Sequence, residues 1–283
     1  MSYSLKYGCQ VGAVLKNYDF YEGLDEYLKL AQKIELKSVE LDFSHPAIFI
    51  DGLRPRILPW CITDDIKRFI KDYVENFEIK GAHLPFASMG FLSVSPNEKL
   101  QKVSREKIKQ AIILCSDLNL DFVTVHIEGK IPKLTYDELW SKYEEAILEY
   151  LDCAKDHGII LAIENLGQDL IYLVDLIKRN SNKYLMLTFD VGHAYPLIRI
   201  TRFGNLSKVV EEVSDRIIDI HLHDHNLIRD HLPVGEGVID FESLIKTLKR
   251  KKYKGAVNLE IEAKSIEDII KSIETLRSFE SKA

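Results

Sequence analysis

The stretch from Thr188 to Ala194, which reads T-F-D-V-G-H-A, places a histidine three residues after an aspartate. It closes an apolar run, Tyr184 to Phe189, of the kind that forms a buried parallel strand. An Asp at the end of such a strand, followed by this His, directs two metal-binding side chains toward one region. Taken alone, the pattern fits a turn-forming or helix-capping Asp better than a metal ligand. The metal interpretation therefore depends on recurrence of the pattern.

The pattern does recur, because other apolar runs also end in His, Asp or Glu. The residues at the expected strand ends are His83, His126, Glu164, Asp190, His221 and Glu260. Carboxylates that converge in one cleft repel one another, and a divalent cation removes that cost. Oxygen and nitrogen donors suit Mn²⁺, Zn²⁺, Co²⁺ or Mg²⁺, and the lack of thiolate favours a catalytic ion over a structural one. Any single His of this set fits a buried rim histidine equally well.

Composition narrows the class of protein. The chain has 283 residues, of which 46% are hydrophobic, and a net charge of −6, which weighs against nucleic acid as the partner. The first ten residues lack the apolar segment of a signal peptide, and no run reaches the roughly 18 apolar residues of a membrane span. We therefore expect a soluble, cytoplasmic protein without a membrane partner. The four cysteines are scattered without a C-x-x-C pair, so neither a thiolate zinc site nor a disulfide framework is expected.

Hydrophobic periodicity predicts the elements that position these side chains. Strands are expected over 4–11, 38–43, 79–84, 122–127, 159–164, 184–189, 217–222 and 256–261. Helices are expected over 23–36, 64–77, 97–118, 135–157, 170–180, 206–214, 241–251 and 266–279, with Leu100 and Val103 of the third facing the sheet. The alternation has no linker and no low-complexity tract. It predicts an α/β fold, a single (β/α)8 TIM barrel over 1–283, with its active site at the carboxyl ends of the strands.

Seven short motifs carry a resemblance to a known superfamily. They are H-L-P-F at His83, V-H-I-E-G at His126, I-E-N at Glu164, F-D-V-G-H-A at Asp190 and His193, H-L-H-D at His221, D-H-L-P-V-G-E-G from Asp230, and L-E-I at Glu260. In order and spacing, the chain resembles the xylose isomerase-like barrels, which include sugar isomerases and epimerases as well as endonuclease IV. The motifs cover most of the chain and are less specific for activity than for the superfamily.

The sugar isomerase and epimerase branch supplies the first functional hypothesis. The resemblance implies one divalent metal at Glu164, Asp190, His221 and Glu260, with the two glutamates also moving the proton. Chelation of a ketose carbonyl and its neighbouring hydroxyl acidifies the intervening C–H, so the proton moves through an enediolate. His193 would bind a hydroxyl of the small carbohydrate substrate, which can be a sugar, a sugar acid or a sugar phosphate.

Endonuclease IV supplies the alternative hypothesis, a zinc-dependent phosphodiesterase acting at abasic sites in DNA. Its relatives hold up to three zinc ions. Here His83 and His126 would join Glu164 at one ion, and His193, His231 and an Asp would hold another. The family pattern is Asp-x-His, whereas Asp230 stands directly beside His231, which puts that ion in doubt. A barrel that binds a sugar without turnover is the third hypothesis.

Further substrate-binding candidates lie near the rim. His83 and Glu40 are assigned this role, as are Arg54 and Arg56 of a proline-punctuated segment over 44–61 that is expected to form a lid or substrate loop. Glu260 is preferred to Glu262 as the ligand, and His223 is expected to support the ligands or lie in the core. The sequence leaves open the identity of the sugar, the identity of the metal and whether the chain forms a homodimer.

Overall fold

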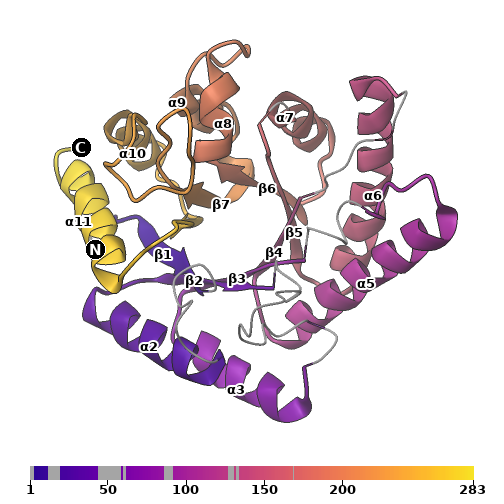
Figure 1. Cartoon of the computed structure of the whole chain (residues 1–283), viewed down its shortest axis with the longest axis horizontal. Coiled ribbons are helices and arrows are strands. Elements are labelled where there is room, and N and C mark those ends of the chain that lie inside the picture. The colour runs from indigo at the N-terminus through magenta and orange to yellow at the C-terminus, as the bar shows by residue number, and fades with distance from the viewer. Residues whose placement is uncertain are drawn as a thin grey trace.

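The computed structural model is a closed ring of parallel strands surrounded by helices (Figure 1). It describes residues 3–11, 20–43, 59, 62–85, 92–126, 131, 134–167 and 169–283. The strands are β1 (Lys6–Gln10), β2 (Ser38–Asp42), β3 (Ile79–His83), β4 (Phe122–Val125), β5 (Ile160–Glu164), β6 (Leu185–Asp190), β7 (Ile217–Leu222) and β8 (Ala256–Leu259). They pair in chain order and β1 closes on β8, which confirms the predicted barrel.

Helices follow the strands and cover the outside of the barrel. They are α2 (Phe20–Lys33), α3 (Asp64–Val74), α5 (Glu98–Asp117), α6 (Tyr136–Asp156), α7 (Leu170–Arg179), α8 (Val191–Ile198), α9 (Leu206–Val213), α10 (Phe241–Arg250) and α11 (Ile266–Ser281), with the 3-10 turn η2 (Ser214–Arg216) before β7. A capping box begins α6, since Thr135 and Glu138 each accept the backbone N–H of the other. None of the described helices is long and apolar enough to cross a membrane.

Two sequence expectations about the helices are wrong. Helix α8 was not predicted, because it is short and contains Gly192 and Pro196, both poor helix formers. Leu100 and Val103 of α5 were expected to face the sheet but are 46% and 58% exposed. The buried face of α5 instead begins with Ser104 and Arg105, whose guanidinium pairs with two glutamates of α6. Two polar residues, Ser104 and Arg105, thus lie on the buried face of α5 where Leu100 and Val103 were expected.

The inside of the barrel is apolar at one end and polar at the other. Ile79, Phe122, Ala162 and Ala256, most of them at strand starts, form a small apolar cluster of their own. Phe122 fills space that only Gly81 leaves open, because a Cβ there would lie 2.2 Å from the ring. The strand carboxyl ends instead bury Glu40, Asp190 and His221. Buried charged and histidine side chains therefore gather toward the carboxyl ends of the strands, away from this apolar cluster.

Candidate metal centre

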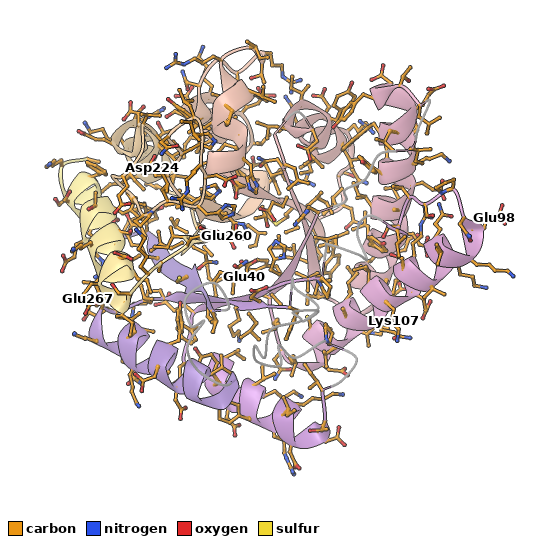
Figure 2. The ribbon with its side chains drawn as sticks, in the orientation of Figure 1. Glu40, Glu98, Lys107, Asp224, Glu260 and Glu267 are labelled. Carbon is orange, nitrogen blue, oxygen red and sulfur yellow. The ribbon has the colours of Figure 1, made fainter. Side chains whose placement is uncertain are left out.

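Four side chains from consecutive strands meet at the polar end of the barrel. Glu164 and Asp190 end β5 and β6, His221 lies in β7, and Glu260 directly follows β8. One ligand atom from each lies within 4.8 Å of the others. The Nδ1 atom of His221 is 3.1 Å from Oε1 of Glu164 and 2.8 Å from Oε2 of Glu260. The structure therefore brings together the four residues that the family resemblance implied as one ligand set, and Figure 2 shows Glu260 near the centre of the ring.

The electrostatics of this group fit a divalent cation. Burial alone would raise the pKa of Glu164, but His221 and His83 hold it well below its usual value. Burial likewise opposes protonation of His221, yet Glu40, Glu260 and Glu164 raise its pKa well above 6.5. The carboxylates thus require a positive charge between them, which a metal ion supplies as well as a proton does. Three carboxylates and one imidazole form a donor set for Mn²⁺, Co²⁺, Zn²⁺ or Mg²⁺.

Two further histidines, His83 and His126, lie beside Glu164. The Nε2 atom of His83 is 2.8 Å from Oε2 of Glu164, and Nδ1 of His83 donates to the carbonyl of Leu84 at 3.1 Å. Burial lowers the pKa of His83, but Glu164 outweighs it and raises the pKa to about 10. His83, His126 and Glu164 form another group with ligand atoms within 4.8 Å. This is the arrangement that the sequence assigned to an additional ion.

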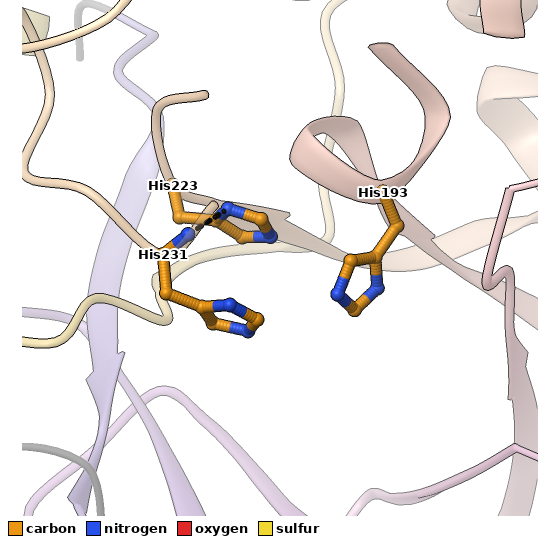
Figure 3. Close-up of side chains that lie close together, drawn as sticks. All are labelled: His193, His223 and His231. Atoms are coloured by element: carbon orange, nitrogen blue, oxygen red, sulfur yellow. Dashed lines mark hydrogen bonds between the residues drawn. The ribbon is translucent and has the colours of Figure 1, made fainter. Parts of the chain in front are cut away.

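Three histidines lie close together, and Figure 3 shows their side chains. His193, His223 and His231 have ring nitrogens within 4.8 Å, and the rings of His223 and His231 stack at 4.1 Å. The backbone N–H of His231 donates to Nδ1 of His223 at 2.8 Å, so Nδ1 carries no proton. Nε2 of His223 therefore donates to Asp190, 3.0 Å away. His223 thus supports a ligand, as expected.

Asp230 lies at the edge of this histidine cluster. Its Oδ1 is 3.2 Å from Nδ1 of His231, and its Oδ2 is 3.8 Å from Nε2 of His193. The positions of His193 and His231 agree with the sequence expectation of an adjacent pair. The ring nitrogens within 4.8 Å include those of His223 and not Asp230, but both nitrogens of His223 are engaged, one by the backbone N–H of His231 and the other by Asp190. In the sequence, the H-x-H spacing of His221 and His223 indicates that these two side chains point to the same side of the strand.

Local sequence fixes the geometry of Asp190. Its Oδ1 accepts the backbone N–H of His193 at 2.6 Å and so caps α8, while the side chain of Asn165 bonds both backbone groups of Asp190 at 3.0 and 2.9 Å. Gly192 is required by close approach, because a Cβ there would lie 1.9 Å from the ring of His223. The motifs I-E-N and D-V-G-H therefore contain supporting residues that ligand-type reasoning alone did not single out.

The segment between β7 and α10 is organised by Asp224. This buried carboxylate accepts the backbone N–H groups of His225, Gly235, Gly237 and Ile239 at 2.8 to 3.1 Å. Gly235 has a φ of +95°, in the left-handed region that favours glycine. Gly235 and Gly237 thus form part of a tight loop beside the site. Asp224 was missed, because a lone Asp after a strand gives no distinctive signal.

Other predicted site residues have different surroundings. Glu40 is fully buried behind His221, where Thr124 donates to it at 2.8 Å, rather than at the open rim. Glu262 is exposed and its Oε2 lies 3.5 Å from Arg229, whereas Glu260 lies in the centre as preferred. Arg54, Arg56 and most of the segment over 44–61 lie outside the described residues.

The fold and the donor set define a class: a single TIM barrel with a carboxylate-rich, metal-type site at its strand ends. A model of the xylose isomerase-like TIM barrel family matches residues 28–279, so the chain belongs to that family. It is 33% identical to a protein of Methanocaldococcus jannaschii named "Uncharacterized protein MJ1311", over 75% of this chain and 74% of that one. It is 21% identical to L-ribulose-5-phosphate 3-epimerase UlaE of Salmonella paratyphi A, over 62% of this chain and 61% of the relative.

Solved structures share the whole fold. A D-tagatose 3-epimerase-like protein superposes with a TM-score of 0.76 at 24% identity, covering 97% of each chain. The IOLI protein, described with a bound zinc atom, superposes with a TM-score of 0.73 at 16% identity, covering 98% of this chain and 99% of that one. These likenesses establish the architecture of the barrel.

Proposed function

We propose that this protein is a metal-dependent isomerase or epimerase acting on a small sugar, sugar acid or sugar phosphate. The observation that carries the proposal is the convergence of Glu164, Asp190, His221 and Glu260 within 4.8 Å at the polar end of the barrel. The epimerase named among the relatives and the zinc-bound barrel among the similar structures support the same chemistry. The protein's acidic net charge of −6 is also compatible with a carbohydrate substrate.

Each residue has a role in this proposal. The ion, when bound, withdraws electrons from the carbonyl and hydroxyl of the sugar and so acidifies the C–H between them. Glu164 and Glu260 hold the ion, and one carboxylate removes that proton while the other returns a proton on the opposite face, through an enediolate. They come from β5 and β8, which stand three strands apart in the ring. His193, whose side chain is 21% exposed, binds a substrate hydroxyl.

Hydrogen–deuterium exchange tests this function. The protein loaded with Mn²⁺ or Co²⁺ is incubated with a panel of ketoses and ketose phosphates in D₂O, and C–H loss is followed by NMR. We expect exchange at the carbon next to the carbonyl, and a loss of about 10²–10⁴-fold in rate for Glu260→Gln. Glu262→Gln is the matched control, because the same change two residues away removes only a surface contact. Absence of exchange across the panel, with the metal bound, would contradict the proposal.

A zinc-dependent phosphodiesterase is the second candidate. The observation in its favour is a further group, His83, His126 and Glu164, beside the first, with His193 and His231 nearby. Such a cluster could activate a hydroxide at a phosphate. Its test is nicking of an abasic DNA duplex by protein whose zinc content per chain has been measured. Intact DNA with fully loaded protein excludes it, whereas cleavage without sugar exchange would replace the first proposal.

A further inference from the structure

His221 has carboxylates on both sides of its ring. Its Nδ1 atom faces the proposed metal ligands, at 2.8 Å from Glu260 and 3.1 Å from Glu164. Its Nε2 atom lies 3.0 Å from Oε2 of Glu40 in β2 and 3.5 Å from Oδ2 of Asp219 in β7. The side chains of His221, Glu40 and Asp219 are all fully buried. The ring therefore lies between two pairs of acids. Glu164 and Glu260 face Nδ1, and Glu40 and Asp219 face Nε2.

The carboxylates of Glu40 and Asp219 are themselves held by neutral hydrogen-bond donors. Thr124 donates to Oε1 of Glu40 at 2.8 Å, and the amide of Gln10 donates to its Oε2 at 3.4 Å. Asn258 donates to Oδ2 of Asp219 at 2.8 Å and accepts from Ser38 at 2.8 Å. These contacts join residues of β1, β2, β4, β7 and β8. Glu40 and Asp219 consequently have little freedom to move away from the imidazole.

This arrangement has a chemical consequence for metal binding. An imidazole that binds a cation through Nδ1 must carry its single proton on Nε2. A carboxylate facing that proton fixes the tautomer and the ring orientation, and it makes the opposite nitrogen a stronger electron donor. The acid nearest to Nε2 is Glu40, at 3.0 Å; this is a charge contact between two fully buried side chains that is not aligned as a hydrogen bond.

We propose that Glu40, with Asp219 as the weaker partner, is a positioning residue that holds His221 and sets the affinity of the centre for its divalent ion. The inference rests on the proposed metal function and deepens it. It gives Glu40 a role behind the ligand, in place of contact with the substrate. Glu40 is not a member of the four-residue centre, and its contact with a proposed ligand is the one to His221.

Metal affinity tests the proposal without reference to activity. Zn²⁺ dissociation constants are measured by competition with a chromophoric chelator for the wild type, Glu40→Gln, Asp219→Asn and Glu280→Gln. We expect Glu40→Gln to bind about 10–100-fold more weakly, the range typical for partners of metal-binding histidines, and Asp219→Asn to lose less. Glu280→Gln should be unchanged. Glu280 is also a buried glutamate, but it bonds the backbone N–H of Leu5, before β1, at the far end of the barrel.

The outcomes separate this inference from the proposed function. A wild type that binds no Zn²⁺, Mn²⁺ or Co²⁺ removes the metal function itself. A wild type that binds and a folded Glu40→Gln variant of equal affinity overturn only the role of Glu40. If circular dichroism shows that Glu40→Gln does not fold, Asp219→Asn decides, and unchanged affinity there overturns the proposal. A last outcome is that the wild type binds two ions, whereas Glu40→Gln binds only one, with unchanged affinity. Glu40 would then be a ligand of the second ion, which would also overturn the positioning role.

Discussion

At the scale of single residues, the centre depends on side chains that no ligand motif names. The strand-end pattern identified Glu164, Asp190, His221 and Glu260, because each follows an apolar run and carries a metal-binding group. The supporting residues could not be identified in this way. Asn165, Thr124 and Asn258 are common polar residues, and only their contacts across the barrel reveal that they fix a ligand or its partner. Ligand type is encoded locally, whereas ligand support depends on strands distant in sequence.

Gly192 gives the sharpest steric prediction. Gly192→Ala places a methyl group 1.9 Å from the ring of His223, so the ring must leave its contact with Asp190. We expect a loss of about 1–3 kcal/mol in the free energy of unfolding by urea. The double variant with His223→Ala is the control, because removing the ring also removes the clash. If the double variant lost as much unfolding free energy as the two single variants together, this explanation would be contradicted.

Asp169 gives a prediction about pH. Burial raises the pKa of its carboxyl to about 7, although the backbone N–H of Leu166 donates to it at 2.8 Å. The unfolded chain ionises this group near the ordinary value of 3.8, so between about pH 4 and pH 7 the folded state binds the proton and the unfolded state does not. The stability contributed by this proton is therefore present below pH 4 and is lost as the pH rises through 7.

Substitution isolates this contribution. In Asp169→Asn the group no longer titrates, so the difference in unfolding free energy between wild type and variant should shift in favour of the variant from pH 4 to pH 8. Urea unfolding at several pH values measures it. A difference that is constant, or that shifts toward the wild type, would show that the pKa of Asp169 is not raised.

At the scale of elements, the sequence predicted all eight strands and most helices, usually within one or two residues at each end. The predictions succeeded where periodicity was long and the ends carried caps, as for α6 with Thr135 and Glu138. They failed for α8, whose eight residues are too few for a clear period. The anchor of the loop after β7 was not visible in the sequence, since it consists of backbone N–H groups that donate to one carboxylate, Asp224.

That anchor leads to a prediction for the whole loop. In Asp224→Asn, the amide NH₂ would face two of the four backbone N–H donors, from Gly235 and Gly237 or from His225 and Ile239. Each unsatisfied buried donor costs about 1–3 kcal/mol. We expect backbone hydrogen exchange in 225–239 to become at least about tenfold faster, as measured by mass spectrometry. Asp240→Asn is the control, because Asn caps α10 as well as Asp does, and equal acceleration there would contradict the prediction.

At the scale of the whole molecule, the ion and the barrel should stabilise each other. Three of the proposed ligands lie in β5, β6 and β7 and the fourth directly follows β8, so an ion at the centre binds the folded chain and not the unfolded one. At a concentration of about one hundred times its dissociation constant, Zn²⁺ or Mn²⁺ should add about 2.7 kcal/mol to the free energy of unfolding. EDTA should reverse the gain, and Asp190→Asn should reduce it strongly. The same gain in that variant would place the ion elsewhere.

The distribution of donors along the chain has a consequence for how such barrels diversify. All four proposed ligands lie between Glu164 and Glu260, on β5 to β8, while β1 to β4 contribute Gln10, Glu40, His83 and Thr124 around them. A chimaera that joins the second half of this chain to the first half of a relative would inherit every proposed ligand intact. Recombination near α6 would thus exchange the residues around the ion while all four proposed ligands are retained.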